Sequence, residues 1–253
     1  MNSRSKLLLA IAFSATLAAQ TAEELVRRNL QAKGGADKIK LIKTLRMTGK
    51  LQQGGGFTAQ IARDAMAPNL LRQTFTLQGM TAIYAYDGST GWQISPFEGR
   101  RDPELLGEER LRAIVEDADF YGPLVDYQAK GNTIEYLGHD TVDGDDVHRL
   151  KVTLKNGDIF YYYLDPETFL EIRVERAQFV RGSVRETFSE PGSYKLVAGV
   201  YFPFSIESGN KQNAGERTKV TFEKVEANVP IDPQEFKMPS APTGSPSQKE
   251  LDR

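Results

Sequence analysis

Apolar and polar residues alternate in many short segments of this chain, and this pattern constrains the fold more than any other feature. Leu45, Met47 and Leu51 alternate with polar residues in one segment, and the same period recurs in residues 57–62 and 71–77. Alternation with a period of two is typical of antiparallel strands with one apolar and one solvated face. The chain is therefore predicted to form an antiparallel sheet whose apolar face must be covered.

Further strands are predicted in the C-terminal half. Asp165 and Pro166 separate two of them, because Asp at the first position and Pro at the second favour a type I turn. No internal repeat or domain boundary interrupts the series, so residues 20–239 are predicted to form a single domain. The predicted strands cover residues 159–164, 169–175, 182–190, 194–198, 200–207 and 218–225.

A few segments have the pattern of helices. Thr21 and the Glu three residues later form a capping box, which predicts a helix that ends at Gly34-Gly35. Residues 36–43 are expected to form a second short helix. Between two runs of strands, residues 103–119 place apolar residues at helical spacing with charged residues opposite, which predicts an amphipathic helix. Residues 120–127 are expected to add one more short helix and a turn.

These helices are too few to cover a long sheet completely. We therefore predict a mainly β (α+β) fold, an incomplete antiparallel β-barrel, or half-barrel, with helices covering the concave face and helix 103–119 packed into it. The uncovered part of the face would leave an apolar cavity, which is a common place for a ligand. The apolar phase of the strands and of this helix predicts that the cavity is lined by Leu71, Phe75, Leu77, Met80, Tyr84, Trp92, Ile94, Leu111, Ile114 and Val115.

One segment combines a turn signal with the only tryptophan of the chain. Asp87-Gly88 suits the positive φ that tight hairpins require, and Trp92 follows in a strand that stops at Pro96-Phe97. The segment contains no nucleophile, metal-ligand cluster or phosphate-binding loop. Its composition indicates a sheet built around something apolar, so binding is favoured over catalysis.

The two histidines are the best candidates for metal or acid–base chemistry. His139 and His148 flank the acidic residues 143–146, but their spacing fits neither an EF-hand loop nor a zinc motif. A hairpin turn explains the acids. The sequence has no Gly-x-Ser-x-Gly elbow and no phosphate loop. We therefore predict no catalytic residue, no metal and no cofactor, with a hydrolase or a metal-dependent enzyme around the two histidines as an alternative.

The N-terminus predicts export. Arg4 and Lys6 precede the apolar run 7–17, and small residues follow, as in a secretory signal peptide, which we assign to residues 1–19. The run is too short to span a bilayer, and no Cys follows it to carry a lipid anchor. A net charge of −2 gives no electrostatic reason to expect nucleic-acid binding. Residues 240–253, rich in Pro, Ser and Gly, are predicted to be a disordered tail.

Several short motifs, in their order and spacing, resemble the LolA/LolB-like periplasmic lipoprotein carriers, of the outer membrane lipoprotein-sorting type. Each motif is weak alone, and the similarity covers most of residues 21–240. The motifs are Pro68-Asn69, Asp87-Gly88 through Trp92 to Pro96-Phe97, Tyr163–Thr168, Gly199–Phe204, Asn228–Asp232 and Phe236–Pro239.

The resemblance implies an incomplete antiparallel barrel whose cavity holds the acyl chains of a lipoprotein or lipid that crosses the periplasm. It also implies inner-membrane release machinery and an outer-membrane acceptor as partners. In the family an Arg before the Pro-Asn pair latches the lid helices, whereas Ala67 occupies that position here. The lipid-anchored acceptors carry an N-terminal Cys, so this chain resembles the soluble carriers. A periplasmic sensor or binding module on the same fold is the alternative.

Overall fold

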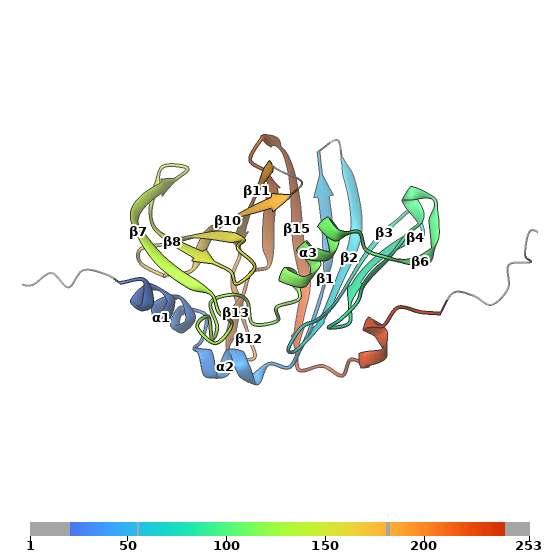
Figure 1. Cartoon of the computed structure of the whole chain (residues 1–253), viewed down its shortest axis with the longest axis horizontal. Helices are drawn as coiled ribbons and strands as arrows, with labels where there is room; N and C mark the ends of the chain where they lie inside the picture. Colours follow the sequence, from blue (N-terminus) through green and yellow to red (C-terminus); the bar gives the residue numbers. More distant parts are fainter. Residues whose placement is uncertain (1–20, 55, 181–182, 241–253) are drawn as a thin grey trace, which may run out of the picture.

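The computed structural model describes residues 21–54, 56–180 and 183–240. The predicted leader, residues 1–19, lies outside these ranges, as does the predicted tail beyond Ser240. The described chain is dominated by one large antiparallel sheet with three α-helices (Figure 1).

Thirteen strands form the large sheet, in the order β6-β5-β4-β3-β2-β1-β15-β14-β11-β10-β9-β8-β7. Strands β6 and β7 are its two edges, so the sheet is not closed into a barrel. Strands β12 and β13 pair separately. The strands are β1 (Thr44–Gln53), β2 (Phe57–Met66), β3 (Leu70–Leu77), β4 (Met80–Tyr86), β5 (Gly91–Ser95), β6 (Arg100–Leu105), β7 (Thr133–Val142), β8 (Asp145–Thr153), β9 (Ile159–Leu164), β10 (Glu171–Val180), β11 (Ser183–Gly192), β12 (Lys195–Val197), β13 (Val200–Phe202), β14 (Ser205–Asn210) and β15 (Asn213–Ala227).

The topology explains why a helix lies across the open side of the sheet. Most strands pair with their neighbours in sequence, but β6 and β7 are consecutive in the chain and lie at opposite edges. The segment that joins them must therefore cross from one edge to the other. This segment carries α3 (Glu108–Asp117), which lies in front of the middle of the sheet in Figure 1.

The two N-terminal helices follow their sequence signals. Helix α1 (Ala22–Ala32) begins at the predicted cap, where the Thr21 hydroxyl accepts a hydrogen bond from the Glu24 backbone N–H at 3.2 Å. Helix α2 (Ala36–Leu41) follows after Gly34, whose φ is +122°. A Cβ on Gly34 would lie 2.3 Å from the Gly199 carbonyl oxygen, so only glycine fits this close approach.

The structure corrects three boundaries. The helix predicted from Pro103 begins only at Glu108, because residues 103–105 belong to β6. Proline is tolerated there because β6 is an edge strand, which leaves one side without hydrogen bonds. Residues 120–127 form turns instead of the predicted extra helix. The strand predicted at 200–207 is divided into β13 and β14, and Pro203 lies between them.

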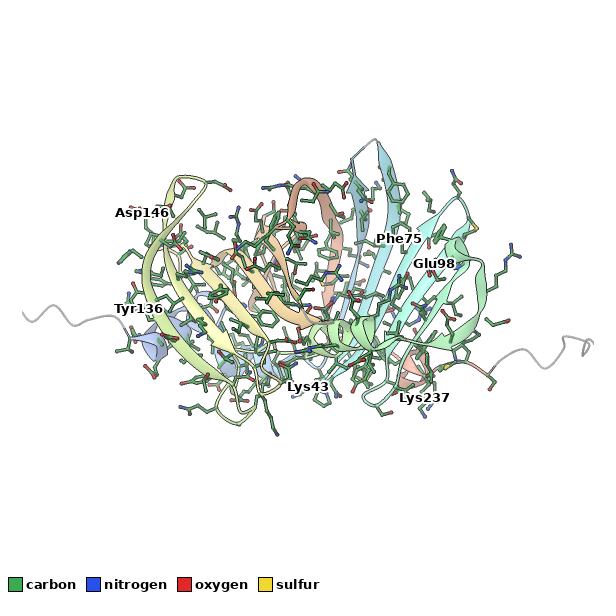
Figure 2. All side chains as sticks on the ribbon, turned by 45° about the horizontal axis from the view of Figure 1, so that its top comes forward. Lys43, Phe75, Glu98, Tyr136, Asp146 and Lys237 are labelled. Atoms are coloured by element: carbon green, nitrogen blue, oxygen red, sulfur yellow. The ribbon has the colours of Figure 1, made fainter. Side chains whose placement is uncertain are left out.

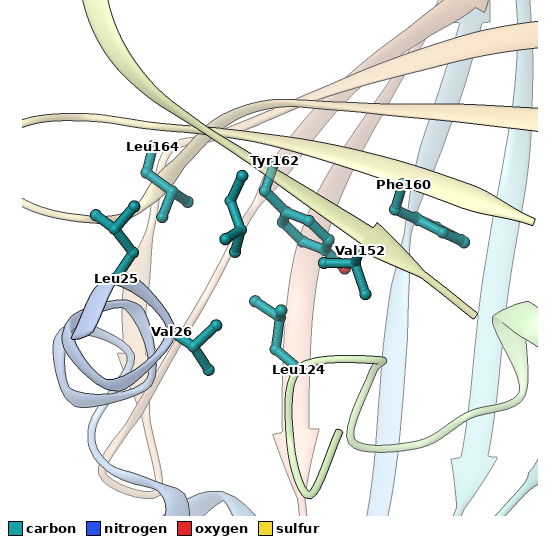
Figure 3. Packing of buried hydrophobic residues seen from close by; sticks show 8 residues of the cluster. Leu25, Val26, Leu124, Val152, Phe160, Tyr162 and Leu164 are labelled. Atoms are coloured by element: carbon teal, nitrogen blue, oxygen red, sulfur yellow. The ribbon is translucent and has the colours of Figure 1, made fainter. Parts of the chain in front are cut away.

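A buried hydrophobic core lies between α1 and the strands β8 and β9. Leu25 and Val26 of α1 belong to one buried cluster with Leu150 and Leu164 of the sheet. Figure 3 shows Leu25 and Val26 beside Leu164 and Leu124. Leu25, Leu150 and Leu164 are fully buried. Burying a side chain of this size stabilises the folded state by about 1.5–3 kcal/mol. Helix α1 thus covers the β8–β9 part of the concave face.

Candidate functional site

An open groove with a volume of about 680 Å³ occupies the other part of the concave face. Its walls come from β1 to β5, from the 3₁₀ turn η1 (Pro96–Glu98) and from β14 and β15. Most of the lining is apolar. The apolar members are Leu51, Phe57, Ile61, Ala62, Phe75, Leu77, Ala82, Tyr84, Phe97, Ile206, Val220 and Phe222.

Strand register brings these side chains to one face. Ile61 of β2 pairs with Phe75 of β3, which in turn pairs with Ala82 of β4, so the three residues form one row across the sheet. Residues directly opposite each other in neighbouring strands point to the same face. Because side chains alternate along each strand, Phe57 and Leu77 share that face with this row.

Aromatic rings lie along one side of the groove. The Phe57 and Phe75 rings are stacked with centroids 5.8 Å apart, and Phe97 meets Phe75 edge-on at 5.7 Å. Figure 2 shows Phe75 and Glu98 near each other on the part of the sheet formed by β2–β6. Phe97 is 40% exposed. The groove therefore presents aromatic surface to solvent.

Three of the residues predicted to line the cavity line this groove, namely Phe75, Leu77 and Tyr84. Met80 pairs with Leu77 at the end of the β3–β4 hairpin and is 38% exposed, outside the groove lining.

Leu71, Leu111 and Ile114 lie next to the groove, in a packed cluster that joins α3 to β3 and β4. Leu71 and Ile114 are buried there. Val115 is 41% exposed and lies beside Phe160, away from the groove. These positions make α3 part of the packed structure, so a lid role for the helix would require this cluster to open.

Trp92 and Ile94 point to the opposite face of the sheet, contrary to the sequence-based lining. Trp92 pairs with Ala85, one residue out of phase with Tyr84, and its Nε1 donates a hydrogen bond to the Phe236 carbonyl at 2.7 Å. This carbonyl belongs to the 3₁₀ turn η2 (Pro233–Phe236). Strand β5 is buried on both faces, so its sequence does not show which face is concave.

Ion pairs hold α3 to the strands on the α1 side. The Arg112 guanidinium pairs with Asp158, and its Nε lies 2.6 Å from Asp158 Oδ2. Arg176 of β10 pairs with Asp117 at 2.8 Å, and Arg185 of β11 pairs with Glu109. Helix α3 therefore marks the boundary between the core under α1 and the groove.

Glu116 is the most perturbed acid of this boundary. Its side chain is only 4% exposed, and it lies 3.5 Å from Arg176 and accepts a hydrogen bond from Gln178 at 3.1 Å. Burial, followed by the interaction with Asp158, raises the pKa of Glu116 to about 7. At Asp158, burial favours a higher pKa. Hydrogen bonds from Glu116 and Arg112 outweigh burial, so the pKa of Asp158 is lowered. One proton is thus held preferentially on Glu116.

The two histidines face each other across β7 and β8, with ring centroids 4.7 Å apart. The Tyr136 hydroxyl lies 3.1 Å from Nδ1 of His148, and Phe169 stacks on the same ring. Burial, then His139, lowers the pKa of His148. The acids between the strands form the predicted hairpin turn at Asp143-Gly144. Within residues 21–54, 56–180 and 183–240, no cluster of three His, Cys, Asp or Glu side chains could hold a metal ion.

The sequence analysis missed the contribution of Ile61, Ile206 and Phe222 to the groove. Ile206 and Phe222 come from β14 and β15, which reach this face because β15 pairs with β1. This pairing joins positions about 170 residues apart, and no local pattern encodes it.

None of the helices among the described residues has the length and hydrophobicity that a membrane-spanning helix needs.

Neither a protein-family model nor a curated protein matches the chain. Solved structures do. An outer membrane lipoprotein-sorting protein domain from Vibrio parahaemolyticus matches with a TM-score of 0.56 and 12% identity, covering 92% of this chain and 98% of that one. A LolA superfamily protein from Nitrosomonas europaea matches with a TM-score of 0.59 and 13% identity, covering 87% and 98%.

A DUF1329 family protein from Desulfovibrio piger has a TM-score of 0.58 and 11% identity, covering 85% of this chain and 97% of that one. Likeness at such low identity shows a shared fold. The chain therefore has the fold of LolA superfamily structures, as the sequence motifs predicted, and the expected incomplete antiparallel barrel is confirmed.

Proposed function

We propose that this protein is an exported, soluble carrier that binds acyl chains of lipoproteins or lipids in the groove and moves them across the periplasm toward the outer membrane. The observation that carries the proposal is the apolar groove of about 680 Å³ on the uncovered part of the concave face. Its volume lies within the range of roughly 300–1,000 Å³ that is typical of small-molecule sites.

The free energy of transferring an acyl chain out of water supports a carrier that shields the chain. Removing a chain of about sixteen carbons from water is favourable by up to roughly 12 kcal/mol, at about 0.8 kcal/mol per CH₂. A free acylated molecule therefore crosses an aqueous space poorly, and a protein that shields the chain removes this barrier. The groove needs no nucleophile or metal for this role, so the proposed function is non-enzymatic.

The fold and the N-terminal sequence support the compartment and the cargo class. The chain has the fold of a lipoprotein-sorting domain, and residues 1–19 have the pattern of a secretory leader. The proposed partners are an acylated lipoprotein or lipid, inner-membrane release machinery and an outer-membrane acceptor. Fold alone does not fix function, so the cargo must be measured directly.

Native mass spectrometry of the protein purified from its own periplasm tests the proposal, and it should show bound lipid. The variant Ile206→Glu places a charge in the groove and should abolish uptake of a fluorescent fatty acid. The matched variant Val184→Glu replaces an exposed apolar residue of β11 outside the groove and should leave uptake unchanged.

Protein that is consistently empty and takes up no fluorescent fatty acid would contradict the carrier proposal. Recovery of one protein partner without lipid in a periplasmic pull-down would instead favour the sensor alternative.

A further inference from the structure

One cationic side chain, that of Arg63, stands among the described residues that line the groove. Arg63 lies on the concave face of β2, in phase with Ile61, and reaches the C-terminal end of α3. Its Nη2 donates a hydrogen bond to the Asp117 backbone carbonyl at the end of α3, at 2.8 Å. Glu98, an acid at the other side of the groove, is paired with Arg110 at 3.1 Å.

Arg63 has spare hydrogen-bonding capacity. A guanidinium has five N–H donors, and this one uses a single donor on a neutral carbonyl. Across residues 21–54, 56–180 and 183–240, no carboxylate lies within ion-pair distance of it. The nearby Asp117 carboxylate is already paired with Arg176. Gln73, opposite Arg63 in the β2–β3 register, also lines the groove.

Among the described residues, none of the acids around α3 forms an ion pair with Arg63. Arg176 and Arg185 are each paired with an acid of α3, and Arg112 of α3 is paired with Asp158, which directly precedes β9. Glu116 lies 3.5 Å from Arg176, and its raised pKa of about 7 leaves it partly neutral at neutral pH. Burial lowers the pKa of Arg63, the nearby Asp117 carboxylate opposes this shift, and Arg176 adds to it. A half-buried cation without an anion is costly, and an anionic ligand would reduce that cost.

We propose that the groove selects an anionic amphiphile, a molecule with one apolar chain and a carboxylate or phosphate headgroup that binds Arg63. The tail would run along β2 toward Phe57, six residues and roughly 20 Å away at about 3.3 Å per residue. This inference rests on the proposed function and narrows it, because the diacylglyceryl group of a lipoprotein carries no anionic headgroup. Guanidinium groups bind carboxylate and phosphate in a bidentate geometry, so both headgroups fit the same chemistry.

The test is a displacement assay on the full chain with N-phenyl-1-naphthylamine as the reporter. Three competitors share one tail, namely dodecanoate, dodecyl phosphate and dodecanol. At neutral pH, at least one anionic competitor should bind the wild-type protein about tenfold more tightly than dodecanol. The tighter of the two anions identifies a fatty acid or a phospholipid as the source of the headgroup. Equal affinity for all three competitors would overturn the inference and leave the carrier proposal intact, whereas no displacement by any of them would contradict both.

Variants separate a headgroup contact from a tether for α3. Arg63→Gln should reduce the anion-to-dodecanol affinity ratio about tenfold, whereas Arg63→Lys, which keeps the charge, should retain part of it. The matched control is Arg72→Gln, since Arg72 lies on the next strand one residue out of phase with the groove-lining Gln73. If Arg63 only tethers α3, its variants change the affinities for dodecanoate and dodecanol equally, and this unchanged ratio would refute the proposal.

Discussion

The two parts of the concave face have the same alternation of side chains along their strands, but one part is a packed core and the other is an open groove. On the β8–β9 side, α1 covers the apolar residues, and Leu25, Leu150 and Leu164 are removed from solvent. On the β1–β4 side, no groove-lining residue of the described chain belongs to an α-helix, and the row of Ile61, Phe75 and Ala82 faces the open groove. An inward apolar residue is therefore core or ligand surface according to what covers it.

Helix α3 lies between the two parts, and a layer of ion pairs connects it to the neighbouring strands. Its acids pair with arginines of β10 and β11, and its Arg112 pairs with the buried Asp158. Such pairs contribute little net stability when they replace apolar contacts, but breaking one leaves a buried charge. The layer thus fixes the position of α3 more than it adds to the stability of the fold.

The largest effect should come from the covered side. Leu25→Ala leaves a cavity between α1 and the sheet, and we expect it to lower the free energy of unfolding by about 2–5 kcal/mol. Urea denaturation measures this loss. The affinity of the remaining folded protein for a fluorescent fatty acid should stay unchanged. A loss of stability below about 1 kcal/mol would show that α1 is not part of the packed core.

The second effect concerns the boundary. The pKa of Glu116 is raised from 4.5 to about 7 in the folded state, so the folded protein binds this proton more tightly than the unfolded chain does. Stability should therefore fall as the pH rises from about 4.5 to about 7, by up to about 3 kcal/mol. Glu116→Gln should remove this fall in urea denaturations across that pH range.

The matched control for this pH effect is Glu108→Gln, which changes an exposed acid at the start of the same helix. It should keep the pH dependence of the wild type. Asp158, whose pKa is lowered, acts with the opposite sign at lower pH, where protonation removes its stabilising contribution. A Glu116→Gln protein with an unaltered pH profile would mean that this acid titrates normally.

The third effect belongs to the open side and should reverse the pattern of Leu25→Ala. Phe75→Ala removes the ring that contacts both Phe57 and Phe97. We expect about a tenfold loss of fatty-acid affinity, equivalent to roughly 1.4 kcal/mol, with a smaller change in the free energy of unfolding. Fluorescence titration measures the affinity. Unchanged affinity would place the acyl chain somewhere other than the groove.

The smallest effect tests the phase of β5. Trp92→Phe removes the hydrogen bond to the Phe236 carbonyl and should lower the free energy of unfolding by about 1 kcal/mol. Because Trp92 lies on the face opposite the groove, fatty-acid affinity should not change. A loss of affinity in a protein of normal stability would indicate that this side of the sheet also affects binding.

The comparison of prediction and structure shows which patterns are informative. Strands with one solvated face, such as β3, reveal their phase, and Phe75 and Leu77 could be placed in the groove from alternation alone. Strand β5 is buried on both faces, so its pattern could not show that Trp92 and Ile94 point outward. The helical spacing of residues 111–118 did not show where the helix begins, and Pro103 lies in an edge strand, which accommodates proline.

The sequence by itself determined most of the strands, the cap of α1, the hairpin turns and, through its motifs, the half-barrel fold. These features depend on neighbouring residues, and local periodicity records them. Only the tertiary structure decided which inward side chains are core and which line the groove, and that Arg63 stands there with no ion-pair partner in the part of the chain that the structure describes. Those properties depend on the β1–β15 pairing and on where α1 and α3 come to lie, and such contacts between distant segments leave no periodic trace in the sequence.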